Sequence, residues 1–166
     1  MYVDFDSLPG SSRIWIYSGD RKFSRKEEDG IADGLRAFCD QWNAHGEPLK
    51  SSFKIEFSQF VIFVVDEDAQ SPSGCSIDGS VRVLKSIGDR TGIDFFDRTR
   101  IPFWINNEIA FVPLGELKGA FKDGTLAPDA LTLNVMARSK GEWEAGTKTR
   151  ADKSWLSRFI PGAHVS

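Results

Sequence analysis

The chain of 166 residues has little of the side-chain chemistry on which metal and thiol sites depend, with two cysteines and two histidines. Two cysteines are too few for a disulfide framework and are typical of a reducing compartment, so we expect a cytoplasmic protein. The sequence contains neither C-x-x-C nor H-x-x-x-H, the spacings that bring thiolates or imidazoles onto one metal ion. We therefore expect no metal site and no cofactor.

Long apolar runs and a strong excess of one charge are also missing. The longest apolar run is far shorter than the ~20 residues that cross a bilayer, and the first residues lack a signal-peptide pattern, so we expect no membrane partner. A net charge of −3 without an RRM-type aromatic motif argues against nucleic acid as a partner. Acids predominate in residues 1–97 and bases in residues 98–166, which would let two copies associate head to tail as a homodimer.

Apolar and aromatic side chains are plentiful, with 13 Phe and 5 Trp in a chain that is 40% hydrophobic. Residues 12–17 and 53–57 alternate polar with apolar side chains, which predicts strands with one wet face. Residues 60–65 are apolar without alternation, which predicts a central strand covered on both faces. A capping box begins a helix expected over residues 25–44, and His45 with Gly46 is expected to close it. A second helix is expected to begin near Cys75.

The order of these elements predicts an α+β protein with a mixed or antiparallel sheet and helices mainly on one face. Residues 1–97 form an expected first lobe, and a strand at 101–105 would complete the β-α-β-β-α-β order of ferredoxin-like folds. Residues 98–166 form an expected second lobe, which continues with a hairpin turning at Asn106 and Asn107, a short helix and a last strand at 131–135. The polar stretch 139–153 predicts no regular structure.

The candidate catalytic residues surround the stretch from Phe60 to Ser80. Cys75 is expected at a helix N-terminus, where the helix dipole favours a thiolate. A Cys-His mechanism would need His45 as the base, because the other histidine, His164, lies near the end of the chain. Asp66 and Asp78 could orient the pair, although nearby carboxylates also favour the protonated thiol. The alternative is structural, with Cys75 or Ser76 capping the helix and His45 ending the preceding one.

The candidate ligand-binding residues lie after the first strand, in the acidic loop and in the second lobe. Arg21, together with Tyr17 and Trp15, could line a pocket for a carboxylate or a phosphate, or could form an ordinary turn with a salt bridge. Glu67 lies in the acidic run that follows residues 60–65. Trp104 and Trp143 are the aromatic side chains expected near a binding groove in the second lobe.

Three pieces of the sequence carry a resemblance that extends over nearly the whole chain. The pieces are WIYSGDRKF (15–23), QWNAHGEPLKSSF (41–53), and VDED with SGCSIDGSVR (65–68 and 73–82). They resemble an uncharacterised family of small bacterial proteins that is often labelled "ABC transporter ATPase". That label does not fit this sequence, since no G-x-x-x-x-G-K-[ST] run is present to hold the nucleotide phosphates.

A second resemblance covers residues 103–135. The succession FWINNEIAFVPL, ELKGAF and DGTLAPDALTL is similar to a bacterial GYF-like module with its hairpin, helix and final strand. The resemblance implies binding of peptides or partner proteins. The aromatic pair and glycine that characterise the module are not cleanly present, since only Phe103 and Trp104 stand near that position.

These observations favour a non-enzymatic binding or interaction protein whose partner is a protein or a small molecule. The ligand is expected at the loop 66–78 and at the hairpin of the second lobe. The alternative is a small enzyme with Cys75 as nucleophile and His45 as base. The enzyme requires a hydrogen bond between Cys75 and His45, whereas the binding protein requires an exposed apolar groove near Trp104 and Trp143.

Overall fold

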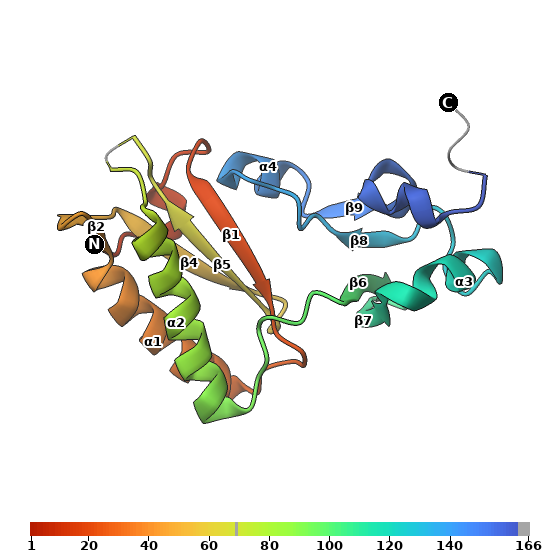
Figure 1. Ribbon diagram of the computed structural model, residues 1–166, viewed down its shortest axis with the longest axis horizontal. Helices are drawn as coiled ribbons and strands as arrows, with labels where there is room; N and C mark the ends of the chain where they lie inside the picture. Colours follow the sequence, from red (N-terminus) through yellow and green to blue (C-terminus); the bar gives the residue numbers. More distant parts are fainter. Residues whose placement is uncertain (69, 163–166) are drawn as a thin grey trace. The chain divides into compact units, whose positions relative to one another are not determined.

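The computed structural model describes residues 1–68 and 70–162 of an α+β protein with antiparallel sheets (Figure 1). The chain divides into two compact units. Unit 1 consists of residues 1–97 and 137–143, and unit 2 consists of residues 98–136 and 144–166. His164, which the sequence analysis set aside, lies outside the described residues. No helix in the described part of the chain combines the length and the apolar character that a membrane crossing requires.

Unit 1 is built on a three-stranded antiparallel sheet in the order β1-β5-β4. The strands are β1 (Arg13–Ser18), β4 (Ser51–Glu56) and β5 (Phe60–Val65). All six residues of β5 are buried, so the prediction of a central strand covered on both faces is confirmed. Helices α1 (Arg25–Gln41) and α2 (Gly74–Thr91) lie along one face of this sheet (Figure 1). The main core lies between them and includes Leu35, Phe63 and Leu84, each fully buried.

The first helix begins where the sequence predicts and ends earlier. Ser24 and Glu27 form the expected capping box. The helix stops at Gln41, because the chain turns into a short hairpin of β2 (Asn43–Ala44) and β3 (Glu47–Pro48). His45 and Gly46 have φ angles of 53° and 80° and form the turn of that hairpin. The expectation that they close the helix is therefore wrong, because the positive φ that suits a helix end also suits a hairpin turn.

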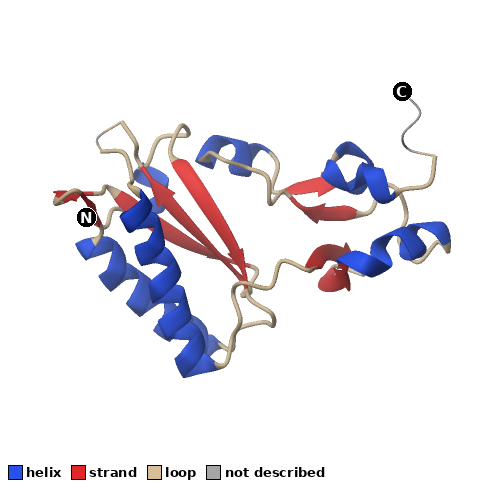
Figure 2. Ribbon diagram, in the orientation of Figure 1, coloured by secondary structure: helices blue, strands red, loops and turns tan. Residues whose placement is uncertain are grey.

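Unit 2 contains a four-stranded antiparallel sheet in the order β7-β6-β8-β9. Figure 2 draws the strands in red and the helices in blue. Asn106 and Asn107, at φ angles of 53° and 64°, make the expected turn between its first two strands. The helices are short, and a separate core gathers around Phe103 and Leu117. The elements that complete both units are η1 (Phe5–Ser7), β6 (Arg100–Ile105), β7 (Glu108–Pro113), η2 (Leu114–Glu116), α3 (Leu117–Lys122), β8 (Leu131–Leu133), α4 (Lys140–Ala145), β9 (Lys148–Arg150), η3 (Ala151–Lys153) and η4 (Trp155–Phe159).

Two expectations about topology need correction. The β-α-β-β-α-β order does not close into one ferredoxin-like sheet, because β6 pairs with β7 and β8 rather than with a strand of unit 1. The stretch 139–153, expected to be irregular, contains α4 and β9. Residues 137–143 return to unit 1, where Ser139 bridges Arg13 and Ile14 donates to the Arg138 carbonyl. Such pairing between distant segments leaves no local pattern in the sequence.

Candidate functional site

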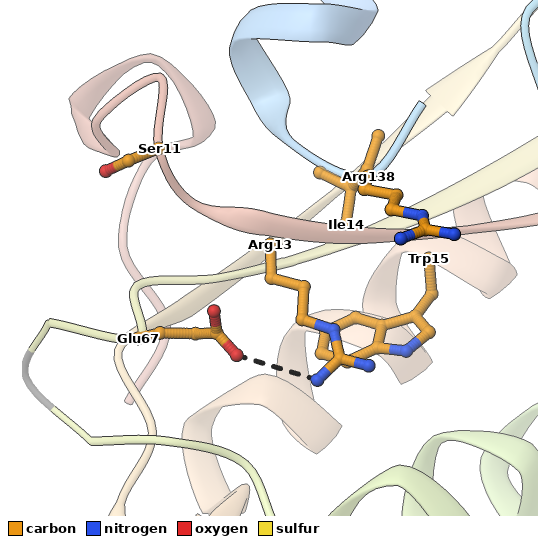
Figure 3. A pocket seen from close by; sticks show the side chains of 6 residues that line it. All are labelled: Ser11, Arg13, Ile14, Trp15, Glu67 and Arg138. Carbon is orange, nitrogen blue, oxygen red and sulfur yellow. Dashed lines mark ion pairs between the residues drawn. The ribbon is translucent and has the colours of Figure 1, made fainter. Parts of the chain in front are cut away.

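A surface pocket of about 540 Å³ lies at the start of β1, within unit 1 (Figure 3). Two arginines and a tryptophan dominate its lining, and one carboxylate stands opposite them. The lining residues are Ser11, Arg13, Ile14, Trp15, Glu67 and Arg138. We call this the β1 pocket.

Strand pairing explains why these residues meet. Arg13 and Trp15 are two residues apart on β1, so their side chains leave the same face of the sheet. Arg13 pairs with Val65 at the end of β5, which brings the acidic residues after β5 beside the start of β1. Arg138 arrives with the segment that pairs with the outer edge of β1, where its carbonyl accepts the Ile14 N–H at 3.1 Å. Three distant parts of the chain thus form one site.

Arg13 makes two contacts inside the β1 pocket. Its guanidinium carbon lies 4.7 Å from the centroid of the Trp15 ring, within the range of a cation–π interaction. Its Nη1 atom lies 3.6 Å from Oε1 of Glu67, the ion pair drawn as a dashed line in Figure 3. The side chains of this pair are 43% and 39% exposed. An ion pair so open to water stabilises the fold little, so a ligand carboxylate can replace Glu67 at small cost.

Arg138 supplies the second positive charge. Its backbone is engaged, because its carbonyl accepts from Ile14 and its N–H donates to Oε2 of Glu142 at 2.8 Å. Its exposed side chain makes no hydrogen bond or ion pair with any residue of the ranges 1–68 and 70–162. In Figure 3 the guanidinium extends toward Trp15. The pocket therefore offers one unpaired guanidinium, one weakly paired guanidinium and an aromatic ring.

This set of groups has the chemistry to bind a carboxylate. A guanidinium presents donors in a planar fork that matches the two oxygens of a carboxylate, and two forks can share one ligand. Trp15 is half-buried, and its ring centroid lies 6.1 Å from that of Trp42 in the core. The ring is thus anchored on its inner side, and it can pack against the apolar part of a ligand.

The proposed catalytic pair does not meet in the structure. Cys75 and His45 are both exposed, and within the described residues no hydrogen bond joins them. Cys75 does not cap α2 either. Ser73 is the N-cap and forms a capping box with Ser76, which leaves Cys75 in the first turn.

The two carboxylates that were expected to orient that pair lie in different surroundings. Asp66 is 9% exposed, and its Oδ1 accepts the Asp68 N–H at 3.0 Å, which makes a local turn after β5. Asp78 is exposed on α2. The structure thus brings no catalytic set together from these four candidates. No group of three or more His, Cys, Asp or Glu side chains able to hold a metal ion occurs in the described part of the chain.

Arg21 and Tyr17, expected to bind ligand, have structural partners. Arg21 donates to both carboxylate oxygens of Glu27 at 2.8 Å and to the Thr91 carbonyl at 2.8 Å. The hydrogen bonds from Arg21 lower the pKa of Glu27 to about 2. Tyr17 is 7% exposed and packs edge-on against Phe63 in the core. The arginines that line the β1 pocket are instead Arg13, at the opposite end of β1, and Arg138.

The structure places the remaining three predicted ligand residues in different surroundings. Glu67 lines the β1 pocket. Trp104 is half-buried on β6 in unit 2, and the Nζ atom of Lys148 lies 4.6 Å from its ring centroid. Trp143 is 2% exposed and belongs to unit 1, so its ring is not available to a ligand. The expectation that Trp104 and Trp143 line one groove is not supported.

Unit 2 has a pocket of its own, of about 460 Å³, formed by β7, η2 and α3. Phe111 and Pro113 provide its strand side, and Gly119 and Ala120 provide its helix side. Its lining residues all lie within residues 103–135. Comparison of the chain with protein-family models, with curated proteins and with solved structures finds no match.

Proposed function

We propose that this chain is a non-enzymatic binding protein that holds a carboxylate ligand in the β1 pocket. The observation that carries the proposal is the Arg138 guanidinium, which has no side-chain partner among the described residues and lines the same pocket as the Arg13–Trp15 pair. Two guanidinium groups against one carboxylate favour the binding of an anion in this pocket. The alternative enzyme with Cys75 and His45 has less support, because no hydrogen bond joins the two residues in the described part of the chain.

Two further parts of the proposal come from the sequence. A cytoplasmic location is supported by Cys39 and Cys75, which are both free thiols, as is usual in reducing compartments. A partner protein for residues 103–135 is a separate proposal, supported by the pocket that β7, η2 and α3 form. It does not depend on the β1 pocket.

The experiment is a calorimetric titration of the protein with benzoate, a planar carboxylate with an apolar ring. Benzamide, which has the same shape without the charge, is the matched ligand control. We expect benzoate to bind and benzamide not to bind. Arg138→Gln should weaken benzoate binding about tenfold, as loss of a charge-assisted hydrogen bond does, and Arg138→Lys should restore part of it.

A matched protein control is Arg82→Gln, which removes an exposed arginine of α2 that does not line the β1 pocket. It should leave benzoate binding unchanged. Equal affinity of wild type and Arg138→Gln for benzoate would contradict the proposal. So would equal affinity of the wild type for benzoate and for benzamide.

A further inference from the structure

The pocket of unit 2 combines an apolar wall with a floor that has almost no side chains. Every residue that lines it belongs to unit 2, and its volume is about 460 Å³. Phe111 and Pro113 of β7 form the apolar wall. Gly119 and Ala120 form the opposite side, so a ligand in this pocket can lie close to the backbone of α3. We call this the α3 pocket.

The packing of the chain does not require a glycine at position 119. A Cβ atom added to Gly119 would meet nothing within 4 Å, and the residue does not have the positive φ that favours glycine. Glycine inside a helix also lowers stability relative to alanine. A side chain at this position would instead take up space in the α3 pocket. Gly115, which lines the pocket too, has the same open space around it.

Two carboxylates flank this floor. Glu116 and Asp123 line the pocket together with Gly119 and Ala120. Measured from Glu116, the other three residues follow at spacings of three, four and seven, which places all four on one face of the helix. At a rise of 1.5 Å per residue the Cα atoms of the two acids are ~10 Å apart along α3. Within the described chain, the lining of the pocket contains no Lys or Arg.

Both carboxylates keep oxygens that no described residue engages. The hydroxyl and the N–H of Thr125 donate to Oδ1 of Asp123 at 2.5 and 2.8 Å, and these hydrogen bonds lower the pKa of Asp123. They fix the carboxylate and leave its Oδ2 atom without a partner in the described part of the chain. Glu116 is exposed, and its side chain makes no hydrogen bond or ion pair with a described residue. The guanidinium of Arg100 stacks on Phe111 at 5.4 Å but does not line the pocket.

We propose that the α3 pocket binds two ammonium groups joined by a short aliphatic stem. One ammonium group donates to Glu116 and the other to Asp123, since an ammonium group offers three donors and a carboxylate only accepts. The stem crosses the floor at Gly119, where its methylene groups pack against the apolar wall. The inference goes beyond the carboxylate site and does not depend on it. A free diamine carries this chemistry, and so do two lysine side chains of a partner protein for residues 103–135.

The test is an NMR titration of the ¹⁵N-labelled protein with 1,5-diaminopentane at constant ionic strength. The control ligand is 1-aminopentane, which has the same stem and one charge. We expect the amide resonances of Gly119 and Thr125 to shift. The diamine should bind about fivefold to tenfold more tightly than the monoamine, as a second charge-assisted contact at the surface allows. Equal affinity for the two ligands would overturn the inference.

Glu116→Gln and Asp123→Asn each remove one charge and keep the shape of the side chain. In either variant the diamine should bind no more tightly than the monoamine. The matched control is Glu108→Gln, which removes an exposed carboxylate of β7 that does not line the pocket. It should leave diamine binding unchanged. An equal loss in Glu108→Gln would show general attraction to negative charge and would overturn a built site.

Gly119→Leu tests the floor of the pocket. It should keep or raise the midpoint of thermal unfolding, because leucine is the better helix former and the added Cβ meets no other atom. The same variant should lose diamine binding, and unchanged binding would contradict the placement of the stem. If Gly119→Leu does not fold, 1,2-diaminoethane tests the stem from the ligand side. Its stem is too short to reach both carboxylates, so it should bind no more tightly than the monoamine.

The acetylated peptide amide Lys-Gly-Lys distinguishes the two sources of the cations. Displacement of the diamine by this peptide, and not by Gln-Gly-Gln, would support the inference and identify a protein segment as the occupant. Diamine binding without displacement would support the inference with a free diamine as ligand, and the pocket would then no longer support a partner protein. Absence of diamine binding beside normal benzoate binding would overturn the inference and leave the β1 pocket proposal in place.

Discussion

The guanidinium carbon of Arg13 lies 4.7 Å from the ring centroid of Trp15, two residues further along β1. The contact follows from strand geometry, since residues two apart share one face of a sheet. The ring holds the guanidinium at the mouth of the β1 pocket, while Glu67 pairs with it only at 3.6 Å. The position of Arg13 is therefore fixed by the ring, and its charge is only weakly paired.

The first prediction concerns Arg13 itself. Arg13→Gln should change the free energy of unfolding by less than about 1 kcal/mol, because both of its contacts are at the surface. The same substitution should weaken benzoate binding about tenfold, as expected for loss of a charge-assisted contact. Urea unfolding and calorimetry measure the two quantities on one preparation. A large loss of stability would show that Arg13 supports the fold rather than the ligand.

The second prediction concerns Glu27 and pH. Hydrogen bonds from Arg21 lower the pKa of Glu27 from 4.5 to about 2, so its ionised form is stabilised by folding. That contribution is fully present above pH 4.5 and is lost as the pH falls through about 2. Glu27→Gln keeps a side chain that can complete the capping box and removes the charge.

Urea unfolding of wild type and Glu27→Gln at several pH values tests the predicted contribution of ionised Glu27 to stability. The wild type should be more stable at pH 6, and the difference should shrink steadily below pH 4.5 until it is nearly absent near pH 2. A difference that does not vary with pH would contradict the role of the Arg21–Glu27 pair.

The third prediction compares two helical glycines. A Cβ atom at Gly88 would lie 2.7 Å from the backbone oxygen of Ile93, whereas a Cβ at Gly30 would meet nothing within 4 Å. Gly30→Ala should stabilise the protein by about 1 kcal/mol, the gain in helix propensity. Gly88→Ala should destabilise it, because the clash with backbone outweighs that gain. Thermal unfolding of both variants measures the two changes in stability. Equal stabilisation by both would show that the turn after α2 can shift to make room for the Cβ atom at little cost.

The fourth prediction concerns the two thiols. Burial raises the pKa of Cys39 to about 12, whereas Cys75 is exposed. A thiol reagent at pH 8 should modify Cys75 in the native protein and Cys39 only after unfolding. Because no hydrogen bond joins Cys75 to His45 in the described residues, His45→Ala should leave the alkylation rate of Cys75 unchanged. A rate that falls severalfold in His45→Ala would revive the enzyme alternative.

Local patterns predicted most elements of the fold and only part of the site. The Ser24–Glu27 capping box, the unbroken apolar run of β5 and the asparagine turn of unit 2 each reflect interactions between near neighbours in sequence. The alternation along residues 12–17 also puts Arg13 and Trp15 on one face of the strand, whereas the predicted ligand residue, Arg21, follows the strand. Arg21 is instead held by Glu27, a partner six residues away.

No local pattern in the sequence predicts the position of Arg138. Its place beside β1 depends on pairing between two segments far apart in the sequence, which no local period records. The same limit applies to residues 101–105, which the sequence predicts as a strand of the first sheet and which lie in the sheet of unit 2 as β6. The order of elements along a chain does not determine which sheet a strand joins.

We propose that Arg13 and Arg138 bind one carboxylate together. The most direct measurement is NMR of the protein with ¹⁵N-labelled arginine, in which each guanidinium Nε–H gives its own signal. Addition of benzoate should shift the Arg13 and Arg138 signals along one saturation curve and leave the signal of Arg82 in place. No shift at Arg138, or equal shifts at all three arginines, would contradict a built carboxylate site at β1.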